Sequence, residues 1–538
     1  MPEAIMMQNT DGKRIHKVEH IRFSNSFKKK IYMQELKITD SEKDYQIPHA
    51  VKEKIAKLNE IRLERKIKVL FLSPPAANYV YGKKISKEVT VRSPPLGMAY
   101  ALAVLEREGY ETYFLDADVD RLSKEEILEK LEIIKPDVVG MTCTTPTFKS
   151  AVTCGQLINE VCSKPLIVLG GPHATAAPDD VAGNYDDVFD FVLRNEGEYA
   201  LTELLKGDDI KGIKGISFKA EDGRVIHNPT RTRNENLDSL PFPNYNLVDL
   251  SKYGDPIWNL YSKKFAPIVT SRGCHYSFTF FASKTIFGQT TQFRSVDNIK
   301  AEIKHLKEDF NVDAIYIVDD TFTLKRDRVI ELCKVFKELN LKWFCQTKVN
   351  HLDFDLIKTM KKSGCQVLAI GCESGDQQVL DAMKKSQTLE MVTQVFDWAN
   401  SVNLDTLGSF IIGMPQDTPK TIEKTIKFAK RLNSTYPLFF QLAPYPGTDI
   451  YDYVVQNDLL TVDNWEDLDS PKWSMPYVKH KTISPEELIA FQKRAYKEVY
   501  FNPRYISKHV LRHIFNPKRA AHMMGLGKMF LSNFLLKK

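Results

Sequence analysis

The sequence has no long apolar run, no paired cysteines and no strong excess of one charge. No run reaches the roughly 18 apolar residues that a membrane-spanning helix needs, and the first residues are too few and too polar for a secretory signal. The eight cysteines are scattered without a C-x-x-C pair, which argues against a disulfide framework and favours small buried side chains. We therefore expect a cytoplasmic protein of ordinary globular composition, with 43% hydrophobic and 27% charged residues.

Positive charge is concentrated at the C-terminal end of the sequence. The whole chain carries a net charge of +6, whereas residues 499–538 contain eight basic residues and no acid. Residues 505–538 mix these with apolar side chains, so they either contact an anionic membrane surface peripherally or pack on the protein with their lysines in water. We favour the second hypothesis. Nucleic-acid binding is not expected, because no basic and aromatic surface module is recognisable.

The first half of the chain alternates buried strands with helices. After a polar extension over residues 1–64, strands are expected at 66–72, 111–115, 137–141 and 166–169, with helices between them. This alternation predicts a parallel, doubly wound (Rossmann-like) sheet over residues 65–206, with ligands at the carboxyl ends of its strands. Small and polar residues at those ends leave room for a large flat ligand: Asp116, Thr142, Thr144, Gly170, Gly171, Pro172 and His173.

A second alternation follows a linker over residues 207–263. About six strand–helix units span residues 264–470, with strands expected at 267–270, 314–318, 343–347, 367–371, 408–413 and 437–442. Six units are too few for an eight-unit barrel and predict a partial parallel barrel, whose chemistry should lie at the strand carboxyl ends. Residues 471–538 are expected to form a helical, basic C-terminal region.

The loop after the first expected barrel strand resembles a known sequence motif. It contains Ser271-Arg272-Gly273-Cys274 and continues through Tyr276, Phe278, Phe280 and Phe281. This segment resembles the radical S-adenosylmethionine (SAM) loop, in which C-x3-C-x2-C follows S-R-G, except that the three cysteine positions are Cys274, Phe278 and Phe281. Further segments resemble the same family, namely 293–303, 318–322, 370–375, 412–418 and 444–448 in the second half, and 169–173 and 195–198 in its cobalamin-binding half.

The resemblance implies a Rossmann-like cobalamin-binding domain followed by a partial (β/α)6 barrel of radical SAM type. It implies cobalamin, SAM and a [4Fe-4S] cluster as cofactors, and radical methylation, cyclisation or rearrangement of a small-molecule substrate. The D-x-H-x-x-G motif that supplies a cobalt ligand in some cobalamin proteins is absent, because residues 115–120 contain no histidine. The implied cobalamin contacts are Asp116, Thr142, Thr144, Gly170, Gly171, Pro172, His173, Glu196, Gly197 and Glu198. The implied SAM contacts are Tyr276, Phe280, Gly371, Glu373, Ser374, Gly413 and Asp417.

The cluster itself is doubtful in this sequence. Thiolates hold such clusters, and a phenyl ring offers no lone pair, so Phe278 and Phe281 cannot be ligands and Cys274 alone remains. The favoured hypothesis is that two phenyl rings fill the cluster volume, which contributes about 1.5–3 kcal/mol each to folding. Relocated ligation by Cys345, Cys365 or Cys372 is disfavoured because strand residues alternate faces. An altered copy of an active parent is the third hypothesis. The chain is thus either an impaired enzyme or a non-catalytic SAM- and cobalamin-binding protein.

Six acidic or histidine residues each allow two interpretations. Glu373 either contacts SAM or pairs with a lysine at a strand end, and His173 either contacts cobalamin or caps a helix. Glu196 and Glu198 either contact cobalamin or form a solvated acidic pair. For Asp319 and Asp320 we favour a salt-bridged pair over direct SAM contact.

Overall fold

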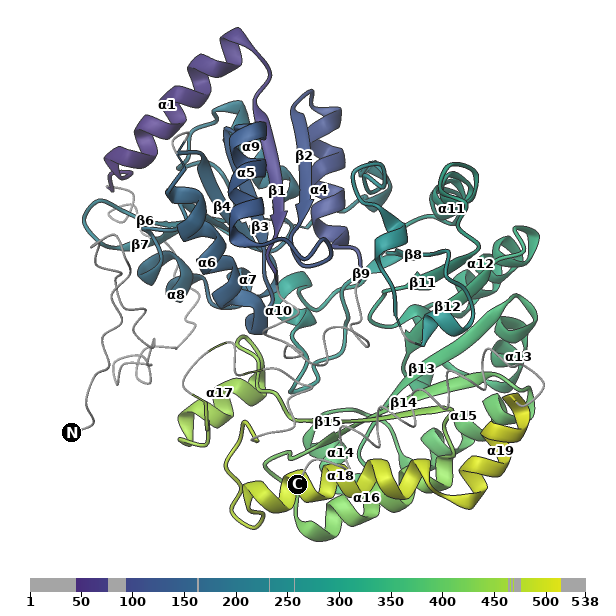
Figure 1. Ribbon diagram of the computed structural model, residues 1–538. Helices are drawn as coiled ribbons and strands as arrows, with labels where there is room; N and C mark the ends of the chain where they lie inside the picture. The colour runs from purple at the N-terminus through teal and green to yellow at the C-terminus, as the bar shows by residue number, and fades with distance from the viewer. Residues whose placement is uncertain are drawn as a thin grey trace.

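The computed structural model describes residues 45–75, 93–161, 164–231, 233–255, 257–462, 465, 468 and 476–513. Helix α1 (His49–Glu64) leads into two α/β units that lie side by side (Figure 1). Residues 1–44 of the expected extension and residues 514–538 of the basic C-terminal region lie outside the described residues. Among the described residues, no helix is both long and apolar enough to span a bilayer.

The first unit is built on a seven-stranded sheet. Five parallel strands lie in the order β2-β1-β3-β4-β5, and β6 and β7 add an antiparallel edge. The order reverses between β1 and β3, which is where doubly wound sheets bind ligands. The prediction of a parallel doubly wound sheet is confirmed. Its strands are β1 (Lys68–Ser73), β2 (Glu111–Asp116), β3 (Val138–Thr142), β4 (Leu166–Gly170), β5 (Phe191–Leu193), β6 (Ile216–Lys219) and β7 (Val225–His227).

Helices cover both faces of this sheet, so its central strands are apolar on both sides. They are α4 (Leu96–Arg107), α5 (Lys124–Ile134), α6 (Phe148–Asn159), α7 (Pro172–Ala176), α8 (Pro178–Asn184) and α9 (Gly197–Lys206). Local signals set several helix ends. In α5, for example, the hydroxyl of Ser123 accepts from the Glu126 amide while the Glu126 carboxylate accepts from the Ser123 amide. Strands β6 and β7 show that the sheet continues into the segment that the sequence interpretation treats as linker.

The second unit is a six-stranded, all-parallel sheet in chain order, open between its first and last strands. This is the predicted partial barrel, and helices α11, α12, α13 and α16 lie on its outer side (Figure 1). Its strands are β8 (Phe265–Ile268), β11 (Ala314–Ile317), β12 (Lys342–Thr347), β13 (Cys365–Glu373), β14 (Asp405–Ile412) and β15 (Tyr436–Gln441). Its helices are α11 (Val296–Phe310), α12 (Arg326–Glu338), α13 (Phe354–Lys362), α14 (Gln377–Ala382), α15 (Leu389–Ser401), α16 (Pro419–Leu432), α18 (Pro485–Tyr500) and α19 (Pro503–His513).

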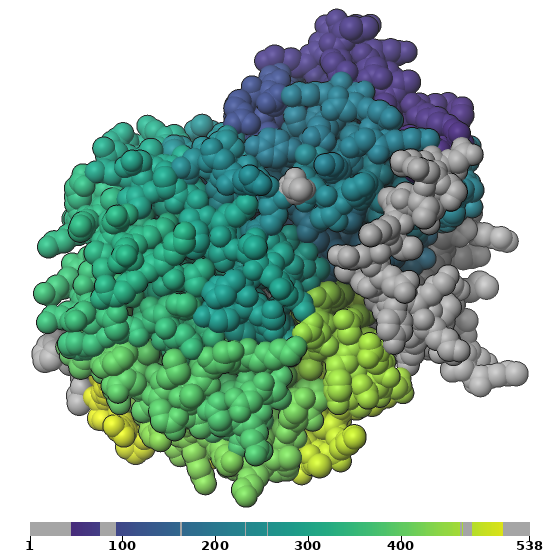
Figure 2. All heavy atoms as spheres, turned by 180° about the vertical axis from the view of Figure 1, so that it is seen from behind, coloured from purple at the N-terminus to yellow at the C-terminus, as the bar shows by residue number. Residues whose placement is uncertain are grey.

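The two units share a buried core. Helix α17 (Asp449–Gln456) follows the barrel and packs its apolar face, with Trp465, into the same cluster as Leu169 of the first sheet. The indole Nε1 of Trp465 donates to Asp180 of α8 at 2.8 Å. On the face drawn in Figure 2 the purple-to-teal first unit continues into the green second unit without a gap. The relative placement of the units is therefore set by packing as well as by the chain connection.

Candidate cofactor sites at the strand ends

The carboxyl ends of β3 and β4 approach each other closely in the first unit. Gly171 has φ +96° and begins the turn into α7, and a Cβ there would lie 2.3 Å from the Thr142 hydroxyl and 2.9 Å from the Cys143 carbonyl. Only glycine fits this position. Beside it, Gly170 is partly exposed, while Thr144 and Pro172 are exposed. The predicted group of small and polar residues is thus brought together around the switch point of the sheet.

His173 is buried in an aromatic cage at this end of the sheet. Its Nδ1 lies 3.2 Å from the Thr145 hydroxyl, its ring centroid lies 4.3 Å from that of Phe148 and 5.1 Å from that of Trp465, and its Nε2 has no partner among the described residues. Burial lowers the pKa of His173 to about 3, so the imidazole is neutral. The helix-cap interpretation of His173 is wrong, because its Nδ1 bonds the Thr145 hydroxyl and its Nε2 bonds no backbone group of the described residues.

Asp116 ends β2 and fastens the chain that links the two units. Its carboxylate accepts from the Tyr253 hydroxyl at 2.7 Å and from the amides of Asp118 and Val119 at 3.1 and 3.0 Å. Burial nevertheless raises the pKa of this carboxyl group. Its predicted contact with cobalamin stays a prediction, whereas its role in holding the turn is visible.

Glu196 and Glu198 face the barrel unit at the corner between β5 and α9, and Gly197 begins α9. Both carboxylates are buried and pair with Arg272, at 2.7 Å from Glu196 and 3.0 Å from Glu198. The interpretation as a solvated acidic pair is therefore wrong. Arg272 stands in the recognised Ser-Arg-Gly segment, but its partners lie more than 70 residues away, and only the fold brings them together.

The loop that contains Cys274 is filled with aromatic rings. Phe278 is buried, and its ring stacks on Tyr276 at a centroid distance of 5.3 Å and on Phe280 at 6.1 Å. The centroid of the Phe281 ring lies 6.0 Å from that of Phe278. The Sγ of Cys274 lies 3.9 Å from the Thr321 hydroxyl, and burial raises the pKa of this thiol. The donor set does not fit a [4Fe-4S] cluster, because one thiol and two phenyl groups occupy the three motif positions.

Two buried lysines that the sequence analysis missed face these rings. Lys385 Nζ pairs with Glu373 at 2.7 Å and lies 4.3 Å from the centroid of the Phe278 ring. Lys348 Nζ lies 3.7 Å from the centroid of the Tyr276 ring, and burial lowers the pKa of Lys348 to about 8, with the charge of Lys385 acting in the same direction. The lysine-paired interpretation of Glu373 is confirmed. No sequence signal marks either lysine, because both lie at the barrel mouth only through the tertiary fold.

The remaining predicted SAM residues lie at the ends of β13 and β14. Asp417 accepts from the amides of Gly413 and Met414, each at 3.0 Å, and burial raises its pKa to about 6. The Ser374 hydroxyl lies 3.2 Å from that of Thr425. Gly371 lies against the Glu373–Lys385 pair, since a Cβ there would be 2.3 Å from the Glu373 carboxylate. The structure thus brings these residues together, with their polar groups already bonded within the protein.

Asp319 and Asp320 are held by hydroxyl and amide donors. Asp319 accepts from the Thr270 amide at 2.6 Å, from the Thr270 hydroxyl at 2.5 Å and from the Ser271 hydroxyl at 2.6 Å, and Asp320 accepts from Ser283. Neither forms an ion pair with a described cation. The favoured salt-bridge interpretation is wrong, and Asp319 instead anchors the start of the Cys274 loop.

The other described cysteines do not offer an alternative metal site. Cys333, Cys345, Cys365 and Cys372 are buried in the barrel's hydrophobic core. Within the described ranges, no group of three or more histidine, cysteine, aspartate or glutamate side chains is arranged to hold a metal ion. Relocated ligation therefore has no geometric support.

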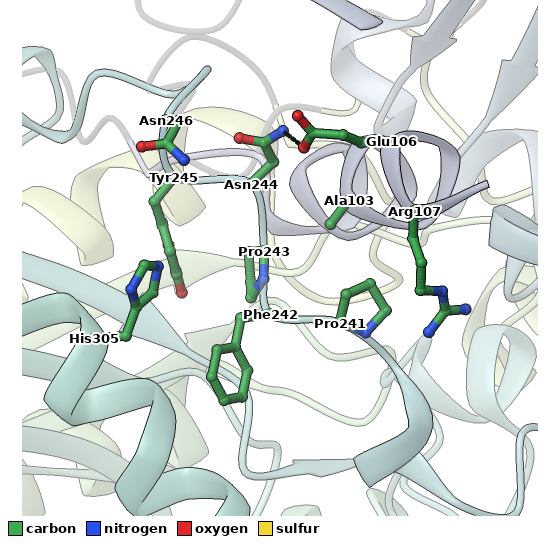
Figure 3. A pocket seen from close by; sticks show the side chains of 10 residues that line it. All are labelled: Ala103, Glu106, Arg107, Pro241, Phe242, Pro243, Asn244, Tyr245, Asn246 and His305. Carbon is green, nitrogen blue, oxygen red and sulfur yellow. Dashed lines mark hydrogen bonds between the residues drawn. The ribbon is translucent and has the colours of Figure 1, made fainter. Parts of the chain in front are cut away.

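A surface hollow of about 330 Å³ lies away from both sets of strand ends (Figure 3). It lies between α4, the chain around Phe242 and His305 of α11, and the Asn244 amide donates to Glu106 at 2.7 Å across one side. None of the predicted cofactor residues lines it, so it contributes nothing to the candidate sites.

The architecture defines a two-unit protein with a cobalamin-type sheet and a radical-SAM-type partial barrel, and sequence comparisons agree. Residues 82–205 match the B12 binding domain model, and residues 269–429 match the radical SAM superfamily model. An uncharacterized methyltransferase of Pyrococcus horikoshii is 32% identical over 456 residues, which is 83% of this chain and 95% of that protein. The chain belongs to the cobalamin-binding radical SAM family.

Other relatives carry methyltransferase or cyclase names. The anaerobic magnesium-protoporphyrin IX monomethyl ester cyclase of Rubrivivax gelatinosus is 26% identical over 88% of this chain and 84% of its own length. Two solved structures share the fold. The cobalamin-dependent SAM radical enzyme OxsB, with aqua-cobalamin and SAM bound, matches with a TM-score of 0.66, 16% identity and coverage of 88% of this chain and 72% of that one. The radical SAM methyltransferase TsrM of Kitasatospora setae, with cobalamin and a [4Fe-4S] cluster bound, matches with a TM-score of 0.60, 18% identity and coverage of 72% and 78%.

Proposed function

We propose that this protein binds cobalamin and SAM but holds no [4Fe-4S] cluster, so that it does not cleave SAM reductively. One observation carries the proposal: phenyl rings stand at two of the three cluster-ligand positions, and the buried ring of Phe278 packs between Tyr276, Phe280 and the ammonium of Lys385. Placing iron there requires removing an aromatic stack as well as supplying ligands. The protein is then a ligand-binding or partner-regulating member of an enzyme family.

The first unit suits cobalamin. Gly171 permits a close approach to the backbone, and the buried Nε2 of His173 is a polar atom that lacks a partner among the described residues. When bound, cobalamin serves relatives as a methyl carrier or structural partner. The proposed contacts around it are Asp116, Thr142, Thr144, Gly170, Gly171, Pro172 and His173.

The SAM contacts are proposed at the barrel mouth. Glu373 suits the ammonium of the methionyl group, and the buried Lys348, which has no described carboxylate at ion-pair distance, suits its carboxylate. The family resemblance and the position at strand carboxyl ends support this group. Its other members are Tyr276, Phe280, Gly371, Ser374, Gly413 and Asp417.

Iron and sulfide analysis after anaerobic reconstitution tests the missing cluster. We expect the iron content to be far below the value of about four irons per chain that one [4Fe-4S] cluster gives. A full complement of iron and sulfide, with adenosyl-radical products from SAM, would refute the proposal.

A restored loop sharpens this test. The Phe278→Cys/Phe281→Cys variant should take up about four irons and cleave SAM, because it recovers the family motif. The matched control is Phe278→Cys/Phe280→Cys, which adds the same number of thiols at the wrong spacing and should do neither. If the restored variant gains no iron, the two phenylalanines are not what excludes the cluster.

Cobalamin binding is tested separately with hydroxocobalamin. The purified chain should retain the corrinoid absorption through gel filtration. A colourless protein after this step would contradict the first-unit assignment, whatever the iron result.

A second candidate is an active radical methyltransferase or cyclase acting on a small molecule. The 32% identity with a methyltransferase over 95% of that relative favours it, and the same iron assay separates the two. Peripheral membrane contact through the basic C-terminal region stays a prediction, as does the expected absence of nucleic-acid binding.

A further inference from the structure

We infer that Asn195, Glu196 and Glu198 are positioning residues for the 273–285 loop and couple ligand binding in the first unit to the order of that loop. The three residues form the corner between β5 and α9, next to the strand end that carries Gly170 and Gly171. The coupling rests on the proposed function, because its ligand is cobalamin, whereas the positioning does not. We refer to the three residues as the corner.

The corner holds the start of the loop through Arg272. The Arg272 guanidinium donates to Glu196 at 2.7 Å and to Glu198 at 3.0 Å, and it lies 5.1 Å from the centroid of the Tyr100 ring. All three charged side chains are at most 9% exposed. Water screens such a group little, and removing one member leaves a buried charge without its full complement. Arg272 therefore stays at the corner, and the backbone of Gly273 and Cys274 starts from a set position.

The corner also holds the far end of the loop. The Asn195 side-chain amide donates to the carbonyls of Thr285 and Ile286 at 3.1 and 2.8 Å, in helix α10 (Ser283–Phe287). Asn195 itself has φ +61°, a conformation that asparagine tolerates better than most residues. One short segment of the first unit thus holds both ends of a loop that belongs to the second unit.

Linker residues complete the attachment. The Asn234 amide donates to the second oxygen of Glu196 at 2.9 Å, and Arg233 donates to the Arg272 carbonyl at 2.9 Å and to the Thr290 carbonyl at 2.6 Å. Strands β9 (Ser271–Arg272) and β10 (Gln292–Phe293) pair just outside these anchors. Asp320 and Asp449 of the barrel unit add contacts to Ser283 and Lys284 near the far end of the loop, so the acidic residues of the corner are the first unit's share of this attachment.

The corner is joined to the candidate cobalamin residues by one hydrogen bond. The backbone N–H of Asn195 donates to the Thr175 hydroxyl at 2.9 Å. Thr175 lies in α7, the helix that begins with Pro172 and His173. Helices α7 and α10 also pack against each other, as Figure 1 shows. A ligand that fixes α7 therefore fixes Asn195 and, through it, α10. Coupling of this kind is reciprocal, so order in the loop also favours ligand binding at α7.

Hydrogen exchange of peptides from 273–285 in the full chain tests the positioning. We expect Glu198→Gln to raise exchange in the loop about tenfold or more, which corresponds to about 1.4 kcal/mol or more of opening free energy. Asn195→Gly should act in the same direction while leaving no buried charge and no φ strain, so it guards against a variant that simply misfolds. The matched control is Glu203→Gln on the same helix, whose partner is Arg231, and it should leave the loop unchanged. Equal loop exchange in the wild type and both corner variants would overturn the positioning.

Adding hydroxocobalamin tests the coupling. In the wild type it should slow exchange in the 273–285 loop, whereas in Asn195→Gly it should bind and leave the loop exchange unaltered. A purely structural role for the corner would not produce this ligand dependence. Equal slowing in both proteins overturns the coupling. If the wild type takes up no hydroxocobalamin, the proposed function and the coupling fail together, and the ligand-free comparison still decides the positioning.

Discussion

Replacing Glu373 by glutamine should destabilise the barrel by about 3 kcal/mol, near the lower end of the range for breaking a buried ion pair. The carboxylate lies 2.7 Å from Lys385 Nζ, and the two side chains are 7% and 8% exposed. The variant would leave the ammonium of Lys385 buried without a counter-charge. The Phe278 ring lies 4.3 Å from that ammonium and would offset part of the loss, which is why we expect the lower end.

A double-mutant cycle with Lys385→Met isolates the pair. Because the double variant buries no charge, it should be more stable than the sum of the single effects implies, with a coupling of about 2 kcal/mol. Urea unfolding followed by circular dichroism gives the free energies, and Lys384→Met is the control, since Lys384 is 61% exposed at its side chain and 3.6 Å from Asp449. That control should cost less than about 1 kcal/mol.

The reasoning fails if Glu373→Gln costs less than about 1 kcal/mol and the two single effects add. Such a result would mean that the contact between Glu373 and Lys385 contributes little to stability, despite its burial. The cycle thus measures how much the Glu373–Lys385 ion pair contributes to the stability of the barrel.

Two further substitutions are predicted. Burial raises the pKa of Asp417 to about 6 from an ordinary 3.8, so the folded chain keeps a proton that the unfolded chain loses. The protonated Asp417 therefore stabilises the fold at low pH, and this stabilisation is lost as pH rises through about 6. The free energy of unfolding of wild type relative to Asp417→Asn should fall by about 2 kcal/mol between about pH 4 and pH 7, and a pH-independent difference would contradict the shift. Gly171→Ala should destabilise by about 1–3 kcal/mol and reduce cobalamin uptake, because its Cβ would meet Thr142 and Cys143 at 2.3 and 2.9 Å. Its control, Gly97→Ala, places a Cβ in open space on α4 and should be neutral or mildly stabilising, and equal effects of the two would rule out the steric argument.

The strands and helices were accessible from local patterns. Apolar runs such as 69–72, which is followed by two prolines, and helices begun by capping residues such as Ser123 predict elements whose ends agree with the structure within a few residues. The alternation of these elements also predicts parallel sheets, because a right-handed crossover helix returns the chain to the same edge. The edge strands β6 and β7 were not assigned to the first sheet, since short antiparallel strands carry little periodic signal.

Side-chain partners were much less accessible. The sequence placed Glu196 and Glu198 near a ligand but could not show that Arg272 uses both carboxylates, because the pair spans 74 to 76 residues and two units. Asp319 and Asp320 suggested a salt bridge by charge alone, whereas the fold supplies hydroxyl and amide donors. Lys348 and Lys385 carry no motif, and they matter only because the end of β12 and the loop after α14 bring them against the aromatic loop.

By itself, the sequence determined which elements form, which family the chain resembles, and that phenyl groups without lone pairs stand at two cluster positions. These are properties of local periodicity and of atom types, and no folding is needed to state them. Only the tertiary structure decided which charges are buried together, which atoms lack a partner, and which corner of the first unit holds the loop of the second. Those outcomes depend on distances between residues far apart in the chain, and such distances are set by packing of the whole molecule.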